Sequence, residues 1–194
     1  MLPALFYEPG HIRRILLLGV GGGAVIHLLH HYVQPAVIDA IELNPVHLHV
    51  ARRYFDVTPS IANLIFADGI NWLQNYTGPR YDMIIDDMFG EEGGKPIRVA
   101  DLDYSWLSTL RKHLSPEGFI VLNTMDSRTL KHAACFTHAQ LAKSFKSAYQ
   151  LDLPIYNNAV GAVFRQPVQA RDLRRRLSQH PALSRLDFRL RRLK

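Results

Sequence analysis

The chain has 194 residues, of which 47% are hydrophobic, with a formal net charge of +6 and one cysteine, Cys135. This length predicts one domain, or one domain with an appendage, and the apolar fraction is enough to bury a core. The sequence has no apolar run of about eighteen residues for a membrane span, no signal-peptide pattern at its start and no cysteine pair for an intrachain disulfide. We therefore expect a cytoplasmic protein that does not enter a membrane.

The positive charge is concentrated at the C-terminal end. Residues 171–194 carry nine Arg or Lys against two Asp, which gives +7, so the rest of the chain is at −1. We expect residues 168–194 to form a basic helical tail that docks through leucines, namely Leu173, Leu177, Leu183, Leu186 and Leu190. A tail of this charge can also bind nucleic acid, but no aromatic residues alternate with the arginines as in single-strand binders.

Strand and helix signals alternate along the chain, which predicts parallel βαβ units. In chain order, the pattern predicts a strand at 14–20, a helix at 24–33, a strand at 36–43, a helix at 44–55 that begins at Asn44 and Pro45, a strand at 63–68, a helix at 69–76, a strand at 81–87, a helix at 104–114, a strand at 118–124, a helix at 128–146 and a strand pair at 149–156 and 159–166. Five β–α units followed by a hairpin resemble the Rossmann-like class I methyltransferase fold. This is an α/β fold with a mostly parallel sheet and a C-terminal antiparallel hairpin, here over residues 1–167.

Glycines or acidic residues follow four consecutive predicted strands, where open parallel sheets bind their ligands. They are Gly19, Gly21 and Gly23 after the first strand, Glu42 and Leu43 after the second, Asp68 and Gly69 after the third, and Asp86 and Asp87 after the fourth. Glycine lets the main chain approach a ligand, and a carboxylate can accept hydrogen bonds from ribose hydroxyls or from an adenine amine. The ordered set predicts an adenosine-type ligand, although a strand-end Asp68 can equally be a helix N-cap.

Two kinds of adenosine ligand fit this pattern. Residues 19–24 satisfy G-x-G-x-x-A, and Glu42 follows at a spacing that suits NAD. The carboxylates after the third and fourth strands would repel the NAD pyrophosphate. They would attract S-adenosylmethionine or its decarboxylated form, which is cationic at sulfur and carries an ammonium group. We therefore favour the sulfonium ligand.

Four segments, at residues 15–29, 40–55, 64–73 and 81–90, resemble the successive motifs of spermidine synthases and their methyltransferase-like relatives. The resemblance covers residues 12–125, and it implies that Glu42 takes the ribose hydroxyls and that Asp68 and Gly69 take the adenine edge. It also implies that Asp87 is the catalytic aspartate, which holds and deprotonates the attacking amine. The expected reaction is transfer of a methyl or aminopropyl group to an amine or another small acceptor.

The chain departs from that family at three places. Gly22 stands where the family usually has an aspartate for the amino tail of the nucleoside, and Gly90, followed by Glu91 and Glu92, stands where a second aspartate is usual. The small β-rich N-terminal domain of the synthases has no room before residue 12. Non-catalytic nucleoside binding, NAD binding and association with nucleic acid through the Arg-rich tail therefore stay open as alternatives, and a homodimer is a further expectation.

The proposed chemistry depends on which aspartate faces the site. Neighbouring residues of a strand point to opposite faces, so we expect Asp87 rather than Asp86 to act as the base, with its pKa raised by burial and by Asp86. Residues 89–96 have the composition of a mobile lid or of an ordinary loop. We expect no metal site, because His27 and His31 share a helix face without further ligands nearby.

Overall fold

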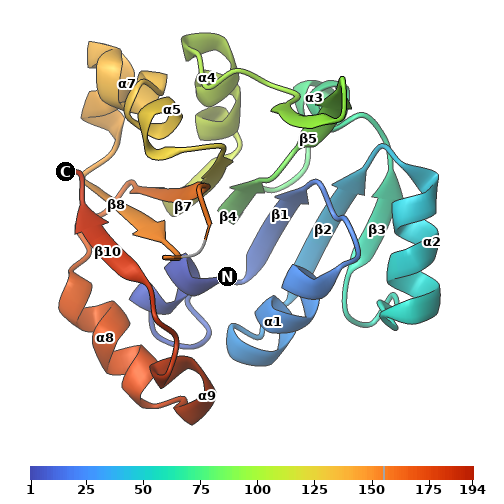
Figure 1. The fold of residues 1–194 in the computed structure, drawn as a ribbon, viewed down its shortest axis with the longest axis horizontal. Helices are drawn as coiled ribbons and strands as arrows, with labels where there is room; N and C mark the ends of the chain where they lie inside the picture. The colour runs from blue at the N-terminus through green and yellow to red at the C-terminus, as the bar shows by residue number, and fades with distance from the viewer. Residues whose placement is uncertain (155) are drawn as a thin grey trace.

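The structure is a computed structural model, and it describes residues 1–154 and 156–194 (Figure 1). The first half contains η1 (Leu2–Phe6), β1 (Arg14–Leu18), α1 (Ala24–Tyr32), β2 (Val37–Glu42), α2 (Pro45–Tyr54), β3 (Asn63–Phe66), α3 (Gly69–Asn75), β4 (Tyr81–Asp86), β5 (Phe89–Glu92) and β6 (Lys95–Arg98). The second half contains α4 (Tyr104–Lys112), β7 (Leu114–Thr124), α5 (Ser127–Lys131), α6 (Ala134–Thr137), α7 (Ala139–Ser144), β8 (Ser147–Asp152), β9 (Ala159–Phe164), α8 (Ala170–Ser178), α9 (Pro181–Ser184) and β10 (Arg189–Arg192).

Within the described residues, eight strands form one sheet in the order β3-β2-β1-β4-β7-β9-β8-β10. The strands from β3 to β7 pair in parallel, whereas β9 pairs antiparallel with both β7 and β8. The order reverses at β1, where the chain crosses from the β1–β3 half of the sheet to β4. This topology confirms the predicted α/β fold, including the antiparallel hairpin, and it brings the ends of β1, β2 and β4 to one edge of the sheet.

Helices cover both faces of the sheet, as Figure 1 shows. Along β1, Leu17 belongs to one buried cluster with side chains from η1, α1 and α8, whereas Leu16 and Leu18 belong to a second cluster with side chains from α3, α4, α6 and α7. All three leucines are 0% exposed. The strand reads as a continuous apolar run because both of its faces are buried.

Two expected elements differ in the structure. The single helix predicted at 128–146 is three short helices, α5, α6 and α7, because the Ala134 N–H leaves the helical pattern and donates to the Leu102 carbonyl at 2.8 Å. Residues 89–96 are neither a loop nor a free lid. They form most of the β5–β6 hairpin, whose base is closed by the Val99 N–H donating to the Met88 carbonyl at 3.1 Å.

The tail is only partly helical. Leu173, Leu177 and Leu183 of α8 and α9 are buried as expected, but Leu186 is 42% exposed. Residues 189–192 are a strand instead of a helix, because β8 offers an unpaired edge with which β10 pairs antiparallel. The predicted division of the chain at residue 167 stays a prediction. In the part of the chain described, no helix is long and apolar enough to cross a membrane.

Candidate functional site

The glycine loop between β1 and α1 lies directly against the end of β4. Gly19 has φ +87°, and a Cβ there would lie 2.3 Å from the Asp87 carbonyl oxygen, so no other residue fits. Gly23, with φ +86°, would place a Cβ 2.9 Å from a Val57 methyl, whereas Gly21, with φ +54°, faces open space. Gly19 therefore permits the contact with β4, and Gly23 permits close packing of α1.

Glu42, at the end of β2, ties this loop down. Its Oε2 accepts hydrogen bonds from the Val20 N–H at 2.9 Å and the Gly21 N–H at 3.2 Å, and its Oε1 accepts from the Asn44 N–H at 2.8 Å. Burial raises the pKa of Glu42, but these three hydrogen bonds outweigh burial and the net pKa is lowered. The side chain is therefore a fixed anion under the loop. Leu43, the next residue, is 59% exposed.

Asp68 is the N-cap of α3, the alternative left open by the sequence. Its Oδ1 accepts the Asn71 N–H at 2.8 Å, which leaves Oδ2 for another donor. Gly69 begins the helix, and a Cβ there would lie 2.7 Å from the Met88 sulfur. The absent side chain thus lets α3 approach the residue that follows Asp87.

Asp86, the last residue of β4, is fully buried. The side chain is 0% exposed, and its Oδ2 accepts from Arg98 Nη2 at 2.6 Å and Trp106 Nε1 at 2.8 Å. Oδ2 thus belongs to a buried ion pair with the β5–β6 hairpin, whereas Oδ1 has no hydrogen-bond partner among the described residues, and a contact between Asp86 and the cofactor stays a prediction. Trp106 packs in the core and is 6% exposed.

Asp87 points to the opposite face and is half-buried. Its Oδ1 accepts from Asn123 Nδ2 at 2.7 Å, and the Asn123 side-chain oxygen in turn accepts from Asn158 Nδ2 at 3.1 Å. Burial raises the pKa of Asp87, the Asn123 hydrogen bond lowers it, and Asp86 raises it, with a raised pKa as the net result. A carboxylate with a raised pKa, positioned by an amide, is suited to accept a proton.

Sequence reasoning missed Asn123 and Arg98. Asn123 interrupts the apolar run of the strand predicted at 118–124, close to its carboxyl end, and that signal could have identified it. Arg98 had no comparable signal, because only the folded hairpin carries its guanidinium to Asp86.

The position without the family aspartate is covered by an aromatic ring. A Cβ on Gly22 would lie 3.2 Å from Cε2 of Phe55, whose side chain is 43% exposed. An aspartate at this position would therefore require the ring to move. The second departure, Gly90, lies within β5 of the hairpin.

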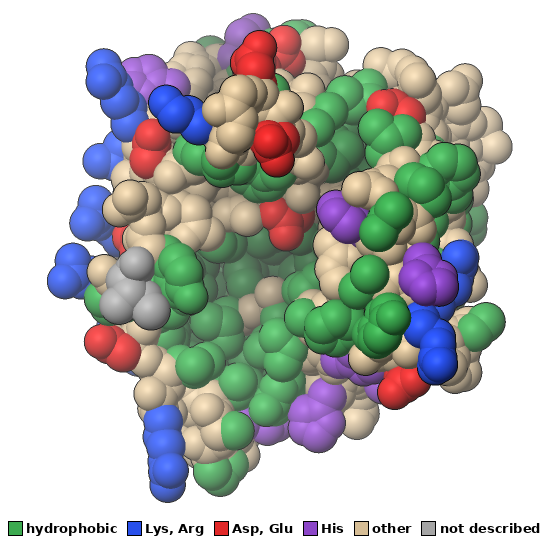
Figure 2. Space-filling model, turned by 45° about the vertical axis from the view of Figure 1, so that its right-hand side comes forward, with side chains coloured by type: hydrophobic (Ala, Val, Ile, Leu, Met, Phe, Trp, Pro, Cys, Tyr) green, Lys and Arg blue, Asp and Glu red, His purple; other side chains and the backbone are tan. Residues whose placement is uncertain are grey.

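The histidines and the cysteine lie apart from this arrangement. The His27 ring hydrogen-bonds the Phe55 carbonyl oxygen. Among the residues described, no three His, Cys, Asp or Glu side chains are placed to hold a metal ion. Burial raises the pKa of the Cys135 thiol to about 12, so it is a buried hydrophobic residue rather than a nucleophile. The space-filling view shows a hollow in the middle of the visible face, walled mainly by hydrophobic side chains with an acidic side chain above it (Figure 2).

A sequence model described as the spermine/spermidine synthase domain matches residues 2–166. The chain belongs to this family. The human eEF1A lysine and N-terminal methyltransferase is 30% identical over 118 residues, which cover 56% of this chain and 17% of that protein. The polyamine aminopropyltransferase of Vibrio vulnificus is 28% identical over 156 residues, which cover 79% of this chain and 50% of that protein. The chain thus spans half or less of the length of these relatives.

Solved structures confirm the family fold. Human methyltransferase-like protein 13, crystallised in complex with SAH, gives a TM-score of 0.75 at 23% identity and covers 96% of this chain and 90% of its own. A spermidine synthase in complex with the transition-state analogue AdoDATO gives 0.64 at 15% identity, over 93% of this chain and 62% of its own. The Rossmann-like methyltransferase fold predicted from the sequence is therefore correct.

Proposed function

We propose that this chain is a transferase that binds S-adenosylmethionine, or its decarboxylated form, and transfers a methyl or aminopropyl group to an amine. The observation that carries the proposal is the convergence at one sheet edge of the glycine loop, Glu42 and Asp87 with its raised pKa. The names of the relatives, a lysine methyltransferase and a polyamine aminopropyltransferase, support the same reaction class.

In this proposal the nucleoside lies over the glycine loop, at the ends of β1, β2 and β3. A carboxylate offers about four acceptor positions, and Glu42 already uses three of them on backbone N–H groups. Two ribose hydroxyls therefore replace at least one loop hydrogen bond when they bind to Glu42. Asp68 keeps its capping bond through Oδ1 and uses Oδ2 for the adenine amine. The exposed side chain of Leu43 gains an apolar contact with the base.

Asp87 carries the proton-transfer step. A bound sulfonium supplies a carbon already activated toward nucleophiles, so the protein has to align the amine with that carbon and remove a proton. The amine nitrogen forms the new N–C bond while the C–S bond breaks and its electron pair stays on sulfur. Asp87 accepts the proton that the nitrogen loses, directly or through one water, and Asn123 holds the accepting carboxylate in place.

The first test is binding, measured by calorimetry with S-adenosylmethionine, decarboxylated S-adenosylmethionine, methylthioadenosine and NAD. We expect affinity of micromolar or tighter for at least one of the first three. Heat with NAD and none with the sulfonium compounds or the thioether would overturn the proposal and restore the dinucleotide alternative.

The second test separates binding from turnover. Asp87→Asn should abolish transfer to putrescine or to a lysine-containing peptide while leaving nucleoside affinity within a few-fold of the parent. Asp187→Asn, a matched change at an exposed carboxylate of the tail, should alter neither. If Asp87→Asn turned over at the parent rate, another residue would have to be the base.

The identity of the amine, a homodimer and a cytoplasmic location belong to the same proposal. The relatives' names support an amine or a polyamine as acceptor. Light scattering of the 194-residue chain at several concentrations tests the dimer. A mass equal to one chain at every concentration would exclude it.

A further inference from the structure

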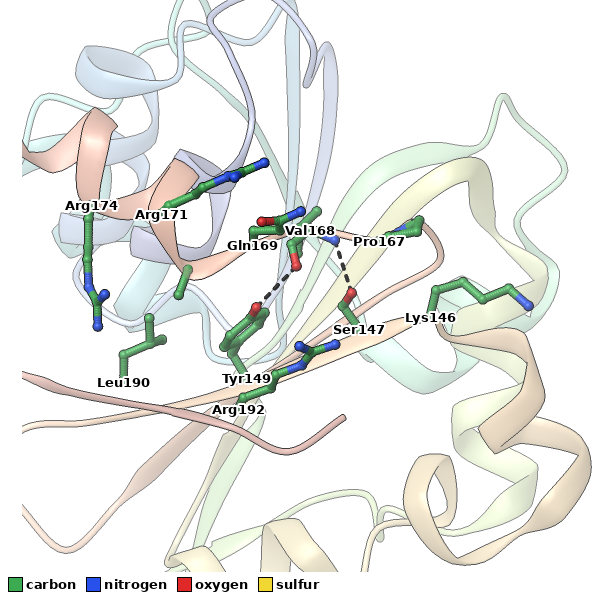
Figure 3. Close-up of a pocket in the computed structure, with 11 residues that line it drawn as sticks. Lys146, Ser147, Tyr149, Pro167, Val168, Gln169, Arg171, Arg174, Leu190 and Arg192 are labelled. Atoms are coloured by element: carbon green, nitrogen blue, oxygen red, sulfur yellow. Dashed lines mark hydrogen bonds between the residues drawn. The ribbon is translucent and has the colours of Figure 1, made fainter.

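A second concave site lies at the far end of the sheet, between the start of β8, β10 and the start of α8. The cavity has a volume of about 650 Å³ (Figure 3). Four of its lining residues are cations, and they come from three parts of the fold: Lys146 before β8, Arg171 and Arg174 on α8, and Arg192 on β10. All four side chains are exposed.

Among the described residues, these four cations form no ion pair with an acidic side chain. The ion pairs within residues 1–154 and 156–194 include none of them. Arg175 and Arg176, on the same helix, both pair with Glu8. In the described part of the chain, α8 therefore has two arginines in ion pairs with a carboxylate, and two at the cavity that form no ion pair. Like charges gathered in this way repel one another, and a bound anion removes that cost.

Two polar side chains of the lining, Ser147 and Tyr149, are already hydrogen-bonded within the fold, so the four cations are its main groups for binding a ligand. Ser147 accepts the Val168 N–H at 3.0 Å and Tyr149 donates to the Val168 carbonyl at 3.1 Å, so these groups serve the fold, as the dashed lines in Figure 3 show. Tyr149 is 3% exposed and offers no ring for stacking. The lining residues that are apolar and not buried are few, namely Pro167, Ala170 and Leu190.

The cavity is separate from the site at Asp87. β8 lies three strands away from β4 in the sheet, or about 14 Å at the usual strand spacing. Ser147 pairs through Phe164 with Phe119, at the opposite end of the parallel strands from Asp87.

We propose that this cavity, which we name the basic pocket, binds the phosphate backbone of a nucleic acid. Guanidinium groups match phosphate oxygens in charge and in fork geometry, and a phosphodiester chain presents several anions in a row to several cations. Without exposed aromatic residues the pocket cannot stack bases, so the contact is independent of base sequence. An acidic peptide is a poorer fit, because peptide sites rely on large apolar anchors, and the apolar groups accessible in this lining are only Pro167, Ala170 and Leu190.

Protection of an edge strand against aggregation is a competing explanation for arginines on β10. Any exposed charged side chain on β10 would protect the edge, whichever face of the strand it lies on. Leu190 and Arg192 line the basic pocket, whereas Arg191 alternates to the other face of β10. Binding of an anion in the pocket, unlike protection of the edge, gives the pocket arginines an effect that Arg191 lacks, so Arg191 provides a matched control.

The test uses fluorescence anisotropy of a labelled single-stranded 20-mer of mixed sequence with the whole chain, at about 50 to about 200 mM salt. With four phosphate contacts, affinity should fall about 50-fold over this range. Arg174→Ala with Arg192→Ala should weaken binding at low salt and reduce that fall to about 7-fold. Arg185→Ala with Arg191→Ala removes the same charge outside the pocket and should leave the parent's salt dependence unchanged.

Three results would overturn the proposal. The first is absence of binding to the oligonucleotide at the lowest salt. The second is equal loss of affinity in the pocket and control variants, which would indicate general attraction to a basic surface. The third is a poly-glutamate peptide that binds more tightly than the oligonucleotide and loses more affinity in the pocket variant, which would assign the pocket to an acidic protein. Circular dichroism of both double variants checks that the fold is retained.

Discussion

Replacement of Asn123 by alanine should shift the pH dependence of Asp87 in a defined direction. The Asn123 amide donates to Oδ1 of Asp87 at 2.7 Å, and this hydrogen bond favours the charged carboxylate. Its removal leaves burial and the nearby Asp86 charge, both of which raise the pKa of Asp87. The acid limb of the transfer rate should therefore move to higher pH.

The size of the shift follows from the kind of bond that is lost. A hydrogen bond to a charged group contributes about 1.5–3 kcal/mol, and one pKa unit corresponds to about 1.4 kcal/mol. The expected increase in the pKa of Asp87 is therefore about 1 to 2 units. Burial already raises the pKa of Asp87 above the ordinary aspartate value of 3.8, so loss of the Asn123 hydrogen bond moves the pKa further in the same direction.

The shift can be measured in two ways. One is the pH dependence of kcat with a saturating amine, and the other is a carbon-13 NMR titration of the Asp87 carboxyl, which needs no acceptor. Asn158→Ala is the matched control, because Asn158 contacts Asn123 at 3.1 Å and does not donate to Asp87. It should move the titration by clearly less than Asn123→Ala.

An unchanged titration in Asn123→Ala would mean that the hydrogen bond does not set the pKa of Asp87. A shift to lower pH would refute the reasoning outright, since it would require the amide to favour the protonated form. An equal shift in Asn158→Ala would assign the effect to general loosening of the site.

Three further outcomes concern stability, each measured by urea denaturation. Gly19→Ala should lower the free energy of unfolding by at least about 2 kcal/mol, because a Cβ there lies 2.3 Å from a main-chain oxygen. Gly21→Ala is the control: a Cβ there meets open space, so only the positive φ destabilises the variant, by about 1 kcal/mol. Arg98→Ala should lower the free energy of unfolding by about 3–5 kcal/mol, because it leaves the buried Asp86 carboxylate without its ion-pair partner. The double variant Arg98→Met with Asp86→Asn removes both charges and should lose much less stability. Equal losses in the two variants would contradict the ion-pair argument. Folding lowers the pKa of Glu42, so the stabilisation from its carboxylate is complete above the ordinary value of 4.5 and is lost as pH falls through the lowered pKa. Glu42→Gln should therefore be less stable than the parent by about 1–2 kcal/mol near neutral pH, and the difference should shrink as pH falls below 4.5. A pH-independent difference would refute this assignment.

Much of the candidate site was predictable because each of its residues at the carboxyl edge of the sheet directly follows a strand with a strong local signal. The run that ends at Gly19, the cap at Asn44 and the short strands before Asp68 and Asp87 are all local patterns. Alternation along a strand was also enough to predict that Asp86 and Asp87 face opposite sides. What alternation could not predict was which side would be closed by another element.

The sequence by itself determined the alternation of strands and helices from β1 to β4, the fold class and the residues that follow those strands, because apolar periodicity, glycines and caps act over a few neighbouring positions. Only the tertiary structure decided the partners of those residues. Arg98 reaches Asp86 from a hairpin, Asn123 reaches Asp87 from the next strand, and residues 189–192 become a strand because β8 has an open edge. Each of these contacts joins segments far apart in the chain, and the free energy that selects them depends on packing and unsatisfied hydrogen bonds that no local pattern contains.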